Sequence, residues 1–359
     1  MREFTYVSLF SGIGGFEQAL NRLGGTCVLA SEIDRFANQA YKALYGEPTV
    51  GDITKVVAED VPDHDVLVGG FPCQAFSVAG KRGGFDDARG TLFFEAARIA
   101  VEKQPKIILL ENVKGLVGHD KGRTLDTIFK TLNEIGYTVD FNLLNSKYFG
   151  VPQNRERIFI VGVRDDLAEQ SDWVIEGNNV VAKGKHRISG YDDVKTFNFD
   201  WPMQEEVTVR MRDILESNVD EMYYLSEDRT AKLVSRLTEK LAAIPESAAT
   251  FANDPIIYGS LNHYGNDQMN RIYSTDGVSP TVTVVSGGGR EPKIAEHKQC
   301  YRIRKLTPLE CFRLQGFSDE AHQTLVDAGI SNSQRYKQAG NAVTVNVIEA
   351  IGAKIARYL

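Results

Sequence analysis

The sequence predicts an α/β protein: a doubly wound, mostly parallel sheet with a second, smaller, loop-rich domain. Through about residue 165, short and nearly all-apolar segments alternate with amphipathic ones, as expected for strands that helices cover on both faces. After about residue 166 this alternation gives way to polar loops with isolated Gly and Pro. The 359 residues also exceed the usual size of one compact core.

The elements of the sheet follow one another along the first part of the chain. Apolar runs predict strands over residues 6–10, 26–32, 65–70, 106–112, 137–145 and 157–163. Helical spacing predicts helices over residues 16–23, 35–45, 92–103 and 124–135. Another helix is expected within residues 226–244, and a last one, after residue 340, is expected to pack back on the first domain. We therefore expect a first domain over 1–185, completed by a C-terminal helix over 335–359, and a second domain with a hinge over 186–334.

The composition excludes several classes of protein. A hydrophobic content of 42% and a charged content of 25% are ordinary for a globular chain. There is no apolar run of transmembrane length, and no signal peptide is visible at the start, so we expect a cytoplasmic protein with no membrane partner. Four cysteines without CxxC spacing disfavour a disulfide framework and a zinc site, and no metal is expected.

The charge distribution is uneven. The net charge of −7 argues against a surface coated with basic patches for nucleic acid. Residues 285–315 nevertheless hold seven basic and three acidic residues, so this stretch is positive while the whole is negative. A local surface for a nucleic-acid backbone remains compatible with the composition.

The segment "YVSLFSGIGGFEQAL" reads as a strand, a glycine-rich turn and a helix. Gly12, Gly14 and Gly15 would let the backbone approach a ligand, although such turns also serve only to pack a strand against a helix. Glu32 ends the next strand, where an acid in this architecture accepts hydrogen bonds from ribose hydroxyls. The loop lacks the full GxGxxG and P-loop patterns, so S-adenosylmethionine fits better than NAD. Asp52 would lie near the adenine, or would cap a turn.

Two residues at strand ends carry candidate chemistry. Cys73 follows Pro72 at the carboxyl end of a predicted parallel strand, where open α/β sheets keep their active crevice. An exposed thiolate there could act as a nucleophile, whereas Cys27, Cys300 and Cys311 are expected to be structural thiols. Glu111 reaches the same edge after four apolar residues and could donate a proton to a ring nitrogen. The alternative for Glu111 is a capping or salt-bridging role.

Arg155 and Arg157 stand immediately before the next strand, in "QNRERIF". On the same rim they could bind a phosphate or hold a ring. Taken alone, such a cluster would more often be a solvated charged turn.

The motifs occur in a characteristic order. Along the chain stand "FSGIGG", "SEID", "GDI", "GGFPCQAFS", "ENV", "QNRERIF", "KLTPLECFRLQGF" and "QAGNAV". This ordered set resembles the cytosine-5 DNA methyltransferase family over nearly the whole chain except its variable middle. The resemblance implies a Rossmann-like, S-adenosylmethionine-dependent catalytic domain over 1–185 and a target recognition domain over 186–334. It also implies S-adenosylhomocysteine as the product.

The resemblance also implies roles for single residues. Cys73 would be the nucleophile, Glu111 the acid at ring nitrogen 3, and Arg155 and Arg157 would orient the ring and the thiol. Asn341 also matches the position that braces the active-site loop. The cofactor would be bound by Phe10, Ser11, Gly12, Gly14, Gly15, Glu32, Ile33, Asp52, Ile53, Phe71, Pro72, Leu92, Asn341 and Ala342. Ser11, Ile13 and Ile33 depart from the residues common in the family, which bears on the strength of cofactor binding.

The expected partner is double-stranded DNA with a flipped target cytosine. Gln268 would fill the space that the base leaves, and Thr281 would contact a phosphate near it. The other expected DNA contacts are Gln74, Ser77, Lys81, Arg89, Arg271, Thr283, Arg290, Arg302 and Arg304. We expect a monomer that needs no stable protein partner, with a cognate restriction endonuclease as a neighbour in a bacterial or phage modification system.

Three alternatives stay open at this stage. The first is a tRNA methyltransferase of the same chemistry, which a comparison of methyl transfer to duplex DNA and to tRNA would separate. The second is an NAD oxidoreductase, although no catalytic His-Asp or Tyr-Lys set is visible. The third is a non-catalytic DNA-binding regulator. The sequence does not identify the bases that would be recognised, because the contacts of a loop depend on where its side chains lie in three dimensions.

Overall fold

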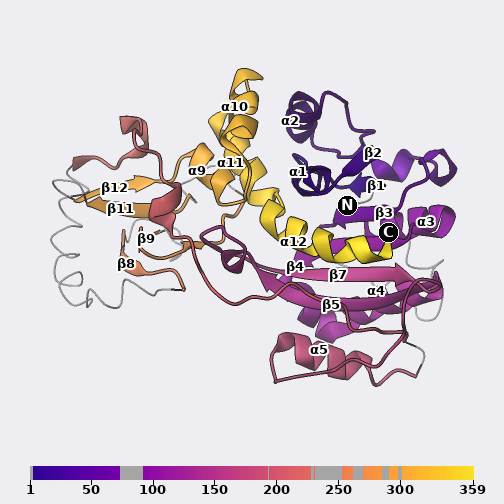
Figure 1. Cartoon of the computed structure of the whole chain (residues 1–359). Helices are drawn as coiled ribbons and strands as arrows, with labels where there is room; N and C mark the ends of the chain where they lie inside the picture. The colour runs from indigo at the N-terminus through magenta and orange to yellow at the C-terminus, as the bar shows by residue number, and fades with distance from the viewer. Residues whose placement is uncertain are drawn as a thin grey trace. The chain divides into compact units, whose positions relative to one another are not determined.

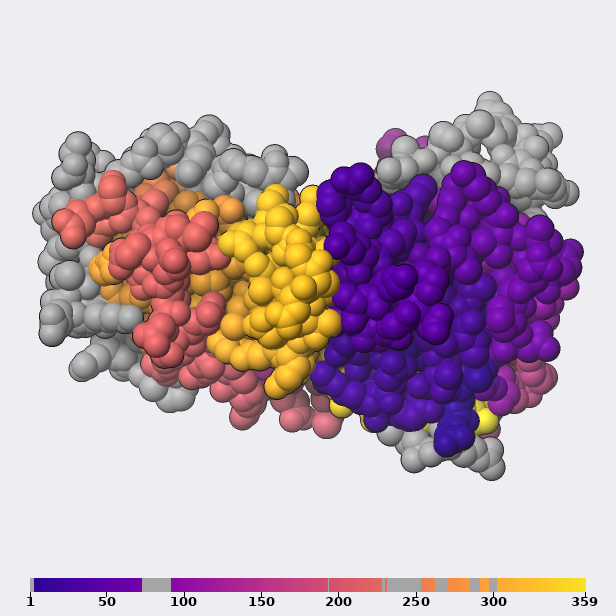
Figure 2. All heavy atoms as spheres, turned by 90° about the horizontal axis from the view of Figure 1, so that it is seen from above, coloured from indigo at the N-terminus to yellow at the C-terminus, as the bar shows by residue number. Residues whose placement is uncertain are grey.

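The computed structural model describes residues 3–72, 92–192, 194–227, 230, 253–261, 270–284, 291–297 and 301–359. The chain forms two compact units. The first comprises Met1–Leu144, Glu156–Met203 and Val347–Leu359, and the second comprises Asn145–Arg155 and Gln204–Asn346. On the face seen in Figure 2, N-terminal residues, coloured indigo to violet, make up most of the first unit's visible surface.

These limits differ from the expected boundaries at 185/186 and 334/335. Residues 186–203 stay with the first unit because Thr196 bridges to Val139 in the sheet and the rings of Phe197 and Phe199 are buried. Only the second half of the expected C-terminal segment, from Val347, belongs to that unit.

The first unit is built on a six-stranded sheet (Figure 1). Its strands are β1 Phe4–Leu9, β2 Gly25–Ser31, β3 Val66–Gly70, β4 Ile107–Val113, β5 Tyr137–Asn145 and β7 Glu156–Arg164. Their order is β2-β1-β3-β4-β7-β5. The pairs β1/β2, β1/β3 and β3/β4 are parallel, whereas β4/β7 is antiparallel. The expected mostly parallel α/β fold is therefore confirmed.

Helices connect and cover these strands. They are α1 Gly15–Arg22, α2 Arg35–Tyr45, α3 Leu92–Lys103, α4 Arg123–Glu134, α5 Val180–Ile188 and α12 Val345–Ile355. Helix α2 begins where the Asp34 carboxylate accepts the amides of Phe36 and Ala37, and it ends at Gly46, whose φ is 80°. Helix α12 packs on α1 through Gly352, where a Cβ atom would come 2.5 Å from the Leu23 side chain.

In the part that the structure describes, the second unit is made of short elements, as the polar loops with isolated Gly and Pro in its sequence predict. A four-stranded sheet has the order β12-β11-β9-β8. Its strands are β8 Ile257–Ser260, β9 Arg271–Ser274, β11 Lys293–His297 and β12 Tyr301–Lys305, and β6 Gln153–Asn154 pairs with β10 Ser279–Pro280. Among the described residues, the helices that accompany them are α9 Pro308–Arg313, α10 Asp319–Asp327 and α11 Asn332–Asn341. A small core gathers around Ile272, Ala295 and Ile303.

The helix expected within residues 226–244 lies almost entirely outside the described residues. In the part of the chain that the structure describes, no helix combines the length and the apolar character that a membrane span requires.

Candidate active site

The glycine-rich loop follows β1 and leads into α1. Phe10, Gly12 and Gly14 have left-handed backbone conformations, with φ of 56°, 58° and 82°. A Cβ atom at Gly14 would come 2.3 Å from the Tyr45 ring, whereas one at Gly12 would meet nothing within 4 Å. Gly14 therefore packs the loop against α2, while Gly12 borders open space.

Glu32 faces this loop from the end of β2. Its Oε2 accepts the Gly12 amide at 2.9 Å, and its Oε1 accepts the Asp34 amide at 2.8 Å. The next residue, Ile33, is 74% exposed although its side chain is large and apolar. A nucleoside needs an acceptor for its ribose hydroxyls and an apolar surface for its base. The half-buried Glu32, the exposed Ile33 and the open side of Gly12 fit those needs.

The other expected cofactor residues differ in surroundings. Asp52 caps the short 3-10 helix Ile53–Lys55, as its structural alternative predicted, and the hydrogen bond from the Thr54 hydroxyl lowers the pKa of its carboxyl. Ser11 donates from its hydroxyl to the carbonyl of Ser31. Ile53 and Phe71 are buried, whereas Pro72 is exposed. Gly15 and Leu92 are the first residues of α1 and α3. Asn341 and Ala342 belong to the second unit.

The carboxyl ends of β3 and β4 form the expected edge. Gly70 of β3 lies in register with Glu111 of β4. The neighbouring Asn112 donates from its side-chain amide to the carbonyl of Phe71 at 2.8 Å, in a buried bond that fixes the chain as it leaves β3. Cys73 follows two residues later and lies outside the described residues.

Glu111 and Arg157 form an ion pair at this edge. Arg157 Nε lies 2.9 Å from Glu111 Oε1, and the two side chains are 18% and 11% exposed. The antiparallel pairing of β4 with β7 produces the contact, because it sets Val113 opposite Arg157. A hydrogen bond from Arg157 Nη1 to the carbonyl of Glu156 further limits the guanidinium. These contacts fix the orientation of the pair, and little of either side chain is exposed to water. The pair can therefore act on a group that binds beside it.

Arg155 belongs to the second unit, although it is only two residues from Arg157. Its side chain is buried, and it donates to the backbone carbonyls of Val282, Gly340 and Ala342.

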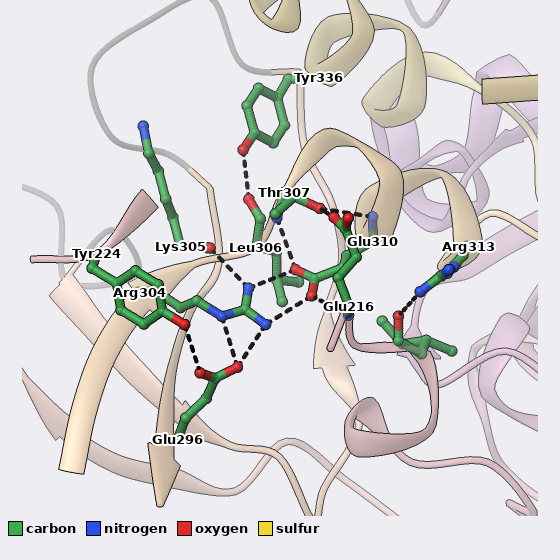
Figure 3. Close-up of polar contacts among 11 residues, drawn as sticks. Glu216, Tyr224, Glu296, Arg304, Lys305, Leu306, Thr307, Glu310, Arg313 and Tyr336 are labelled. Carbon is green, nitrogen blue, oxygen red and sulfur yellow. Dashed lines mark hydrogen bonds and ion pairs between the residues drawn. The ribbon is translucent and has the colours of Figure 1, made fainter. Parts of the chain in front are cut away.

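Arg304 contradicts its expected contact with a DNA phosphate. Its side chain is fully buried, where Nη1 and Nη2 each lie 2.7 Å from an oxygen of Glu310, and Nε lies 2.7 Å from Glu296 Oε1 (Figure 3). Tyr224 donates to the other oxygen of Glu296. Two carboxylates thus neutralise this cation inside the unit, and no face of it is left for a phosphate.

The remaining expected DNA contacts are less enclosed. Arg302 is paired with Glu221 and lies over the Tyr224 ring, with 37% of its side chain exposed. The Thr281 hydroxyl donates to the Asn154 carbonyl at 2.7 Å, so an additional donation to a phosphate would require that bond to break. Thr283 is exposed and Arg271 is half-buried. Gln74, Ser77, Lys81, Arg89, Gln268 and Arg290 lie outside the described residues.

The described cysteines are not suited to nucleophilic chemistry. Burial raises the pKa of the Cys27 thiol to about 12 and raises that of Cys311 well above its ordinary value. Both thiols stay protonated at neutral pH, in line with structural roles. Cys300 lies outside the described residues. Among the residues that the structure describes, no cluster of His, Cys, Asp or Glu could hold a metal ion.

Sequence reasoning missed the roles of Asn112 and Gln153. Asn112 directly follows Glu111 in the motif "ENV", and this position was the one sequence feature that could have indicated its role. Gln153 opens "QNRERIF"; its side chain accepts the Val282 amide and donates to the Leu314 carbonyl. No sequence pattern shows which distant backbone group an amide side chain will reach.

Comparisons with known proteins show which family the chain matches. The family model for C-5 cytosine-specific DNA methylases matches residues 4–357. The orphan methyltransferase M.SPBetaI of Bacillus phage SPbeta is 41% identical, over 98% of this chain and 97% of its own. The type II methyltransferase M.HhaI of Haemophilus parahaemolyticus is 36% identical, over 99% of this chain and 94% of its own.

Solved structures share the fold. The crystal structure of the S. pombe Dnmt2 methyltransferase aligns with a TM-score of 0.66 at 21% identity, over 99% of both chains. A putative DNA modification methyltransferase encoded within an E. coli prophage aligns with a TM-score of 0.59 at 22% identity. The family match and the full-length relatives together show that the chain belongs to the C-5 cytosine-specific DNA methylases, enzymes that methylate DNA.

Proposed function

We propose that this DNA methyltransferase modifies a cytosine that has been turned out of the duplex, through a transient covalent bond to Cys73. The observation that carries the proposal is the edge at which β3 and β4 end together. There the Glu111–Arg157 pair lies beside the Asn112–Phe71 bond, which fixes the backbone two residues before Cys73. This arrangement supports an acid and a nucleophile that act on one ring.

The chemistry requires both residues. Carbon 5 of cytosine is a weak nucleophile, so the Cys73 thiolate first adds to carbon 6 and forms a sulfur–carbon bond. Glu111 protonates ring nitrogen 3, which takes up the electron pair that the addition displaces. Carbon 5 then has enamine character and can accept a methyl group. A base then takes the proton from carbon 5 as the Cys73 thiolate leaves carbon 6, and ring nitrogen 3 returns its proton to Glu111, which restores the ring. Arg157 orients the Glu111 carboxyl throughout.

The family uses S-adenosylmethionine, whose sulfonium supplies an electrophilic methyl group when it is bound. Glu32 would accept the ribose hydroxyls, and its present contact with the Gly12 amide keeps the carboxylate facing the loop. Ile33 would cover one face of the adenine. Gly12 leaves room beside the loop because it has no side chain.

The target base has to leave the duplex because the edge of a sheet cannot reach carbon 6 inside stacked base pairs. Turning the base out costs on the order of a few kcal/mol of stacking and pairing. Gln268 is our candidate for the vacated space, and Arg302, Arg271 and Thr283 are candidates for contacts to the backbone. Relatives named as orphan and as type II methyltransferases leave two roles, a solitary modification enzyme and one partner of a restriction endonuclease.

Methylation of plasmid DNA by the purified protein tests the proposal. 5-Methylcytosine mapped at single-base resolution should fall within one short recurring sequence, and tRNA offered in the same assay should remain unlabelled. Cys73→Ser should abolish transfer while duplex binding persists. Label on tRNA but not on DNA would support the tRNA alternative, and transfer by Cys73→Ser would remove the cysteine from the mechanism.

A further inference from the structure

We infer that Arg155 is a positioning residue: it holds residues 281–284 against the end of α11 and so sets the affinity for DNA, without contacting the reacting cytosine. The inference rests on the proposed function, because it assumes that residues 281–284 face the bound duplex. It replaces the expectation that Arg155 orients the ring.

The contacts of Arg155 connect two separate segments. Nη1 donates to the carbonyl of Val282 at 3.1 Å. Nη2 donates to the carbonyls of Gly340 and Ala342, at 3.2 and 2.9 Å. The side chain is only 3% exposed, so these bonds form in a buried setting. A guanidinium suits this task because its planar, fixed donors can reach several carbonyls at once, and Lys has no equivalent geometry.

The segment that Arg155 holds is fixed from both sides at Val282. The Val282 amide donates to Gln153 Oε1 at 2.9 Å, while its carbonyl accepts from Arg155. The Val282 side chain is fully buried. The next two residues, Thr283 and Val284, are exposed. A buried anchor therefore presents two consecutive side chains to the outside.

The contact with the end of α11 is equally tight. A Cβ atom at Gly340 would lie 2.5 Å from the Thr283 carbonyl oxygen and 2.6 Å from its carbon. The two backbones touch where any side chain would separate them. Arg155 binds the carbonyl of Gly340 at this point of approach, so it bridges the two backbones where they are closest.

These contacts separate Arg155 from Arg157 in function. To contact the substrate, Arg155 would have to break its hydrogen bonds to these backbone carbonyls. The carbonyls would then be buried without a charged donor, which is energetically costly. Arg157 is instead paired with a carboxylate at the strand edge. Loss of Arg155 should therefore loosen the exposed residues 283–284 and weaken DNA binding, while the chemistry at the strand edge proceeds unchanged once DNA is bound.

Arg155→Lys tests this directly. With S-adenosylmethionine saturating and the duplex varied, the KM for DNA should rise by about tenfold or more, the size expected when buried carbonyls lose a charged donor. The value of kcat should stay within about twofold of the wild type. Arg157→Lys is the matched control, for which we expect kcat to fall. A lower kcat with an unchanged KM for Arg155→Lys, or no change in either, would overturn the inference.

Two further measurements keep the test decisive. Gly340→Ala leaves Arg155 in place but drives a methyl group into the Thr283 carbonyl, so it should raise the same KM and should combine less than multiplicatively with Arg155→Lys. Amide hydrogen exchange should be faster at residues 281–284 in Arg155→Lys and unchanged at residues 107–113. This readout does not depend on methylation, so it separates failure of this inference from failure of the proposed function. Unchanged exchange at 281–284 would refute it.

Discussion

A buried carboxyl in the first turn of α1 yields the most quantitative prediction. Glu17 of α1 has no exposed surface, and its Oε1 accepts a hydrogen bond from the Tyr41 hydroxyl at 3.1 Å. Burial raises the pKa of the Glu17 carboxyl from 4.5 to about 7. Since one pKa unit corresponds to about 1.4 kcal/mol, burying the ionised form costs about 3 kcal/mol of folding stability.

The sign of the pH dependence follows from linkage. Below pH 4.5 the carboxyl is protonated in both the folded and the unfolded chain, so its ionisation has no effect on stability. Between pH 4.5 and about 7 the folded state binds more protons than the unfolded state, so this group makes stability fall as pH rises. Above about pH 7 the whole loss is present. Glu17→Gln removes this titrating group. As the pH rises from 4.5 to 8.5, the free energy of unfolding of the variant should therefore increase relative to that of the wild type by up to about 3 kcal/mol.

Urea denaturation of both proteins across this range measures the effect, because the other titrating groups cancel in the difference. Glu349→Gln is a matched control: Glu349 is 41% exposed and pairs with Arg22, and loss of such an exposed pair should change the free energy of unfolding by less than about 1 kcal/mol. A difference for Glu17→Gln that is flat from pH 4.5 to 8.5 would refute the reasoning.

Three further predictions concern other parts of the molecule. Glu111→Gln should slow methyl transfer by about 100-fold or more while cofactor affinity, measured by titration, stays near the wild-type value; a near-normal rate would remove Glu111 from the mechanism. Gly14→Ala should lower both the melting temperature and the cofactor affinity, since the added methyl group would meet Tyr45; an unaltered protein would show that the loop does not pack on α2. Arg304→Met should lower the free energy of unfolding by about 3–5 kcal/mol because two glutamates lose their buried cation, and an unchanged denaturation curve would contradict this.

The sequence predicted the elements of the first unit closely. The helix expected over residues 92–103 is α3 with the same bounds, and the strand expected over 106–112 is β4 shifted by one residue. These elements are predictable because a strand covered on both faces is apolar throughout and a helix keeps its period. A hydrophobic run carries no direction, so the antiparallel entry of β7 could not be foreseen. That direction is what brings Arg157 to Glu111.

The second unit was less predictable because its interactions depend on how separate elements pack together, even where the partners are close in sequence. Arg302 and Arg304 are two residues apart on β12, and the sequence does not distinguish between them. Only the fold brings Glu296 of β11 and Glu310 of α9 to Arg304 and buries it. Similarly, nothing in "QNRERIF" shows that Arg155 will bind three carbonyls while Arg157 binds a carboxylate. Local charge indicates which residues can pair, but the partner depends on tertiary packing.

The most direct test of the account uses duplexes that carry 5-fluorocytosine in place of cytosine at the mapped target. Fluorine at carbon 5 cannot leave as a proton does, so the enzyme should remain bonded to the DNA through carbon 6 once the methyl group has been transferred. We predict an adduct that needs S-adenosylmethionine, survives denaturing electrophoresis and yields a DNA-linked peptide containing Cys73. No adduct on a confirmed target, or one that Cys73→Ser still forms, would contradict the central claim.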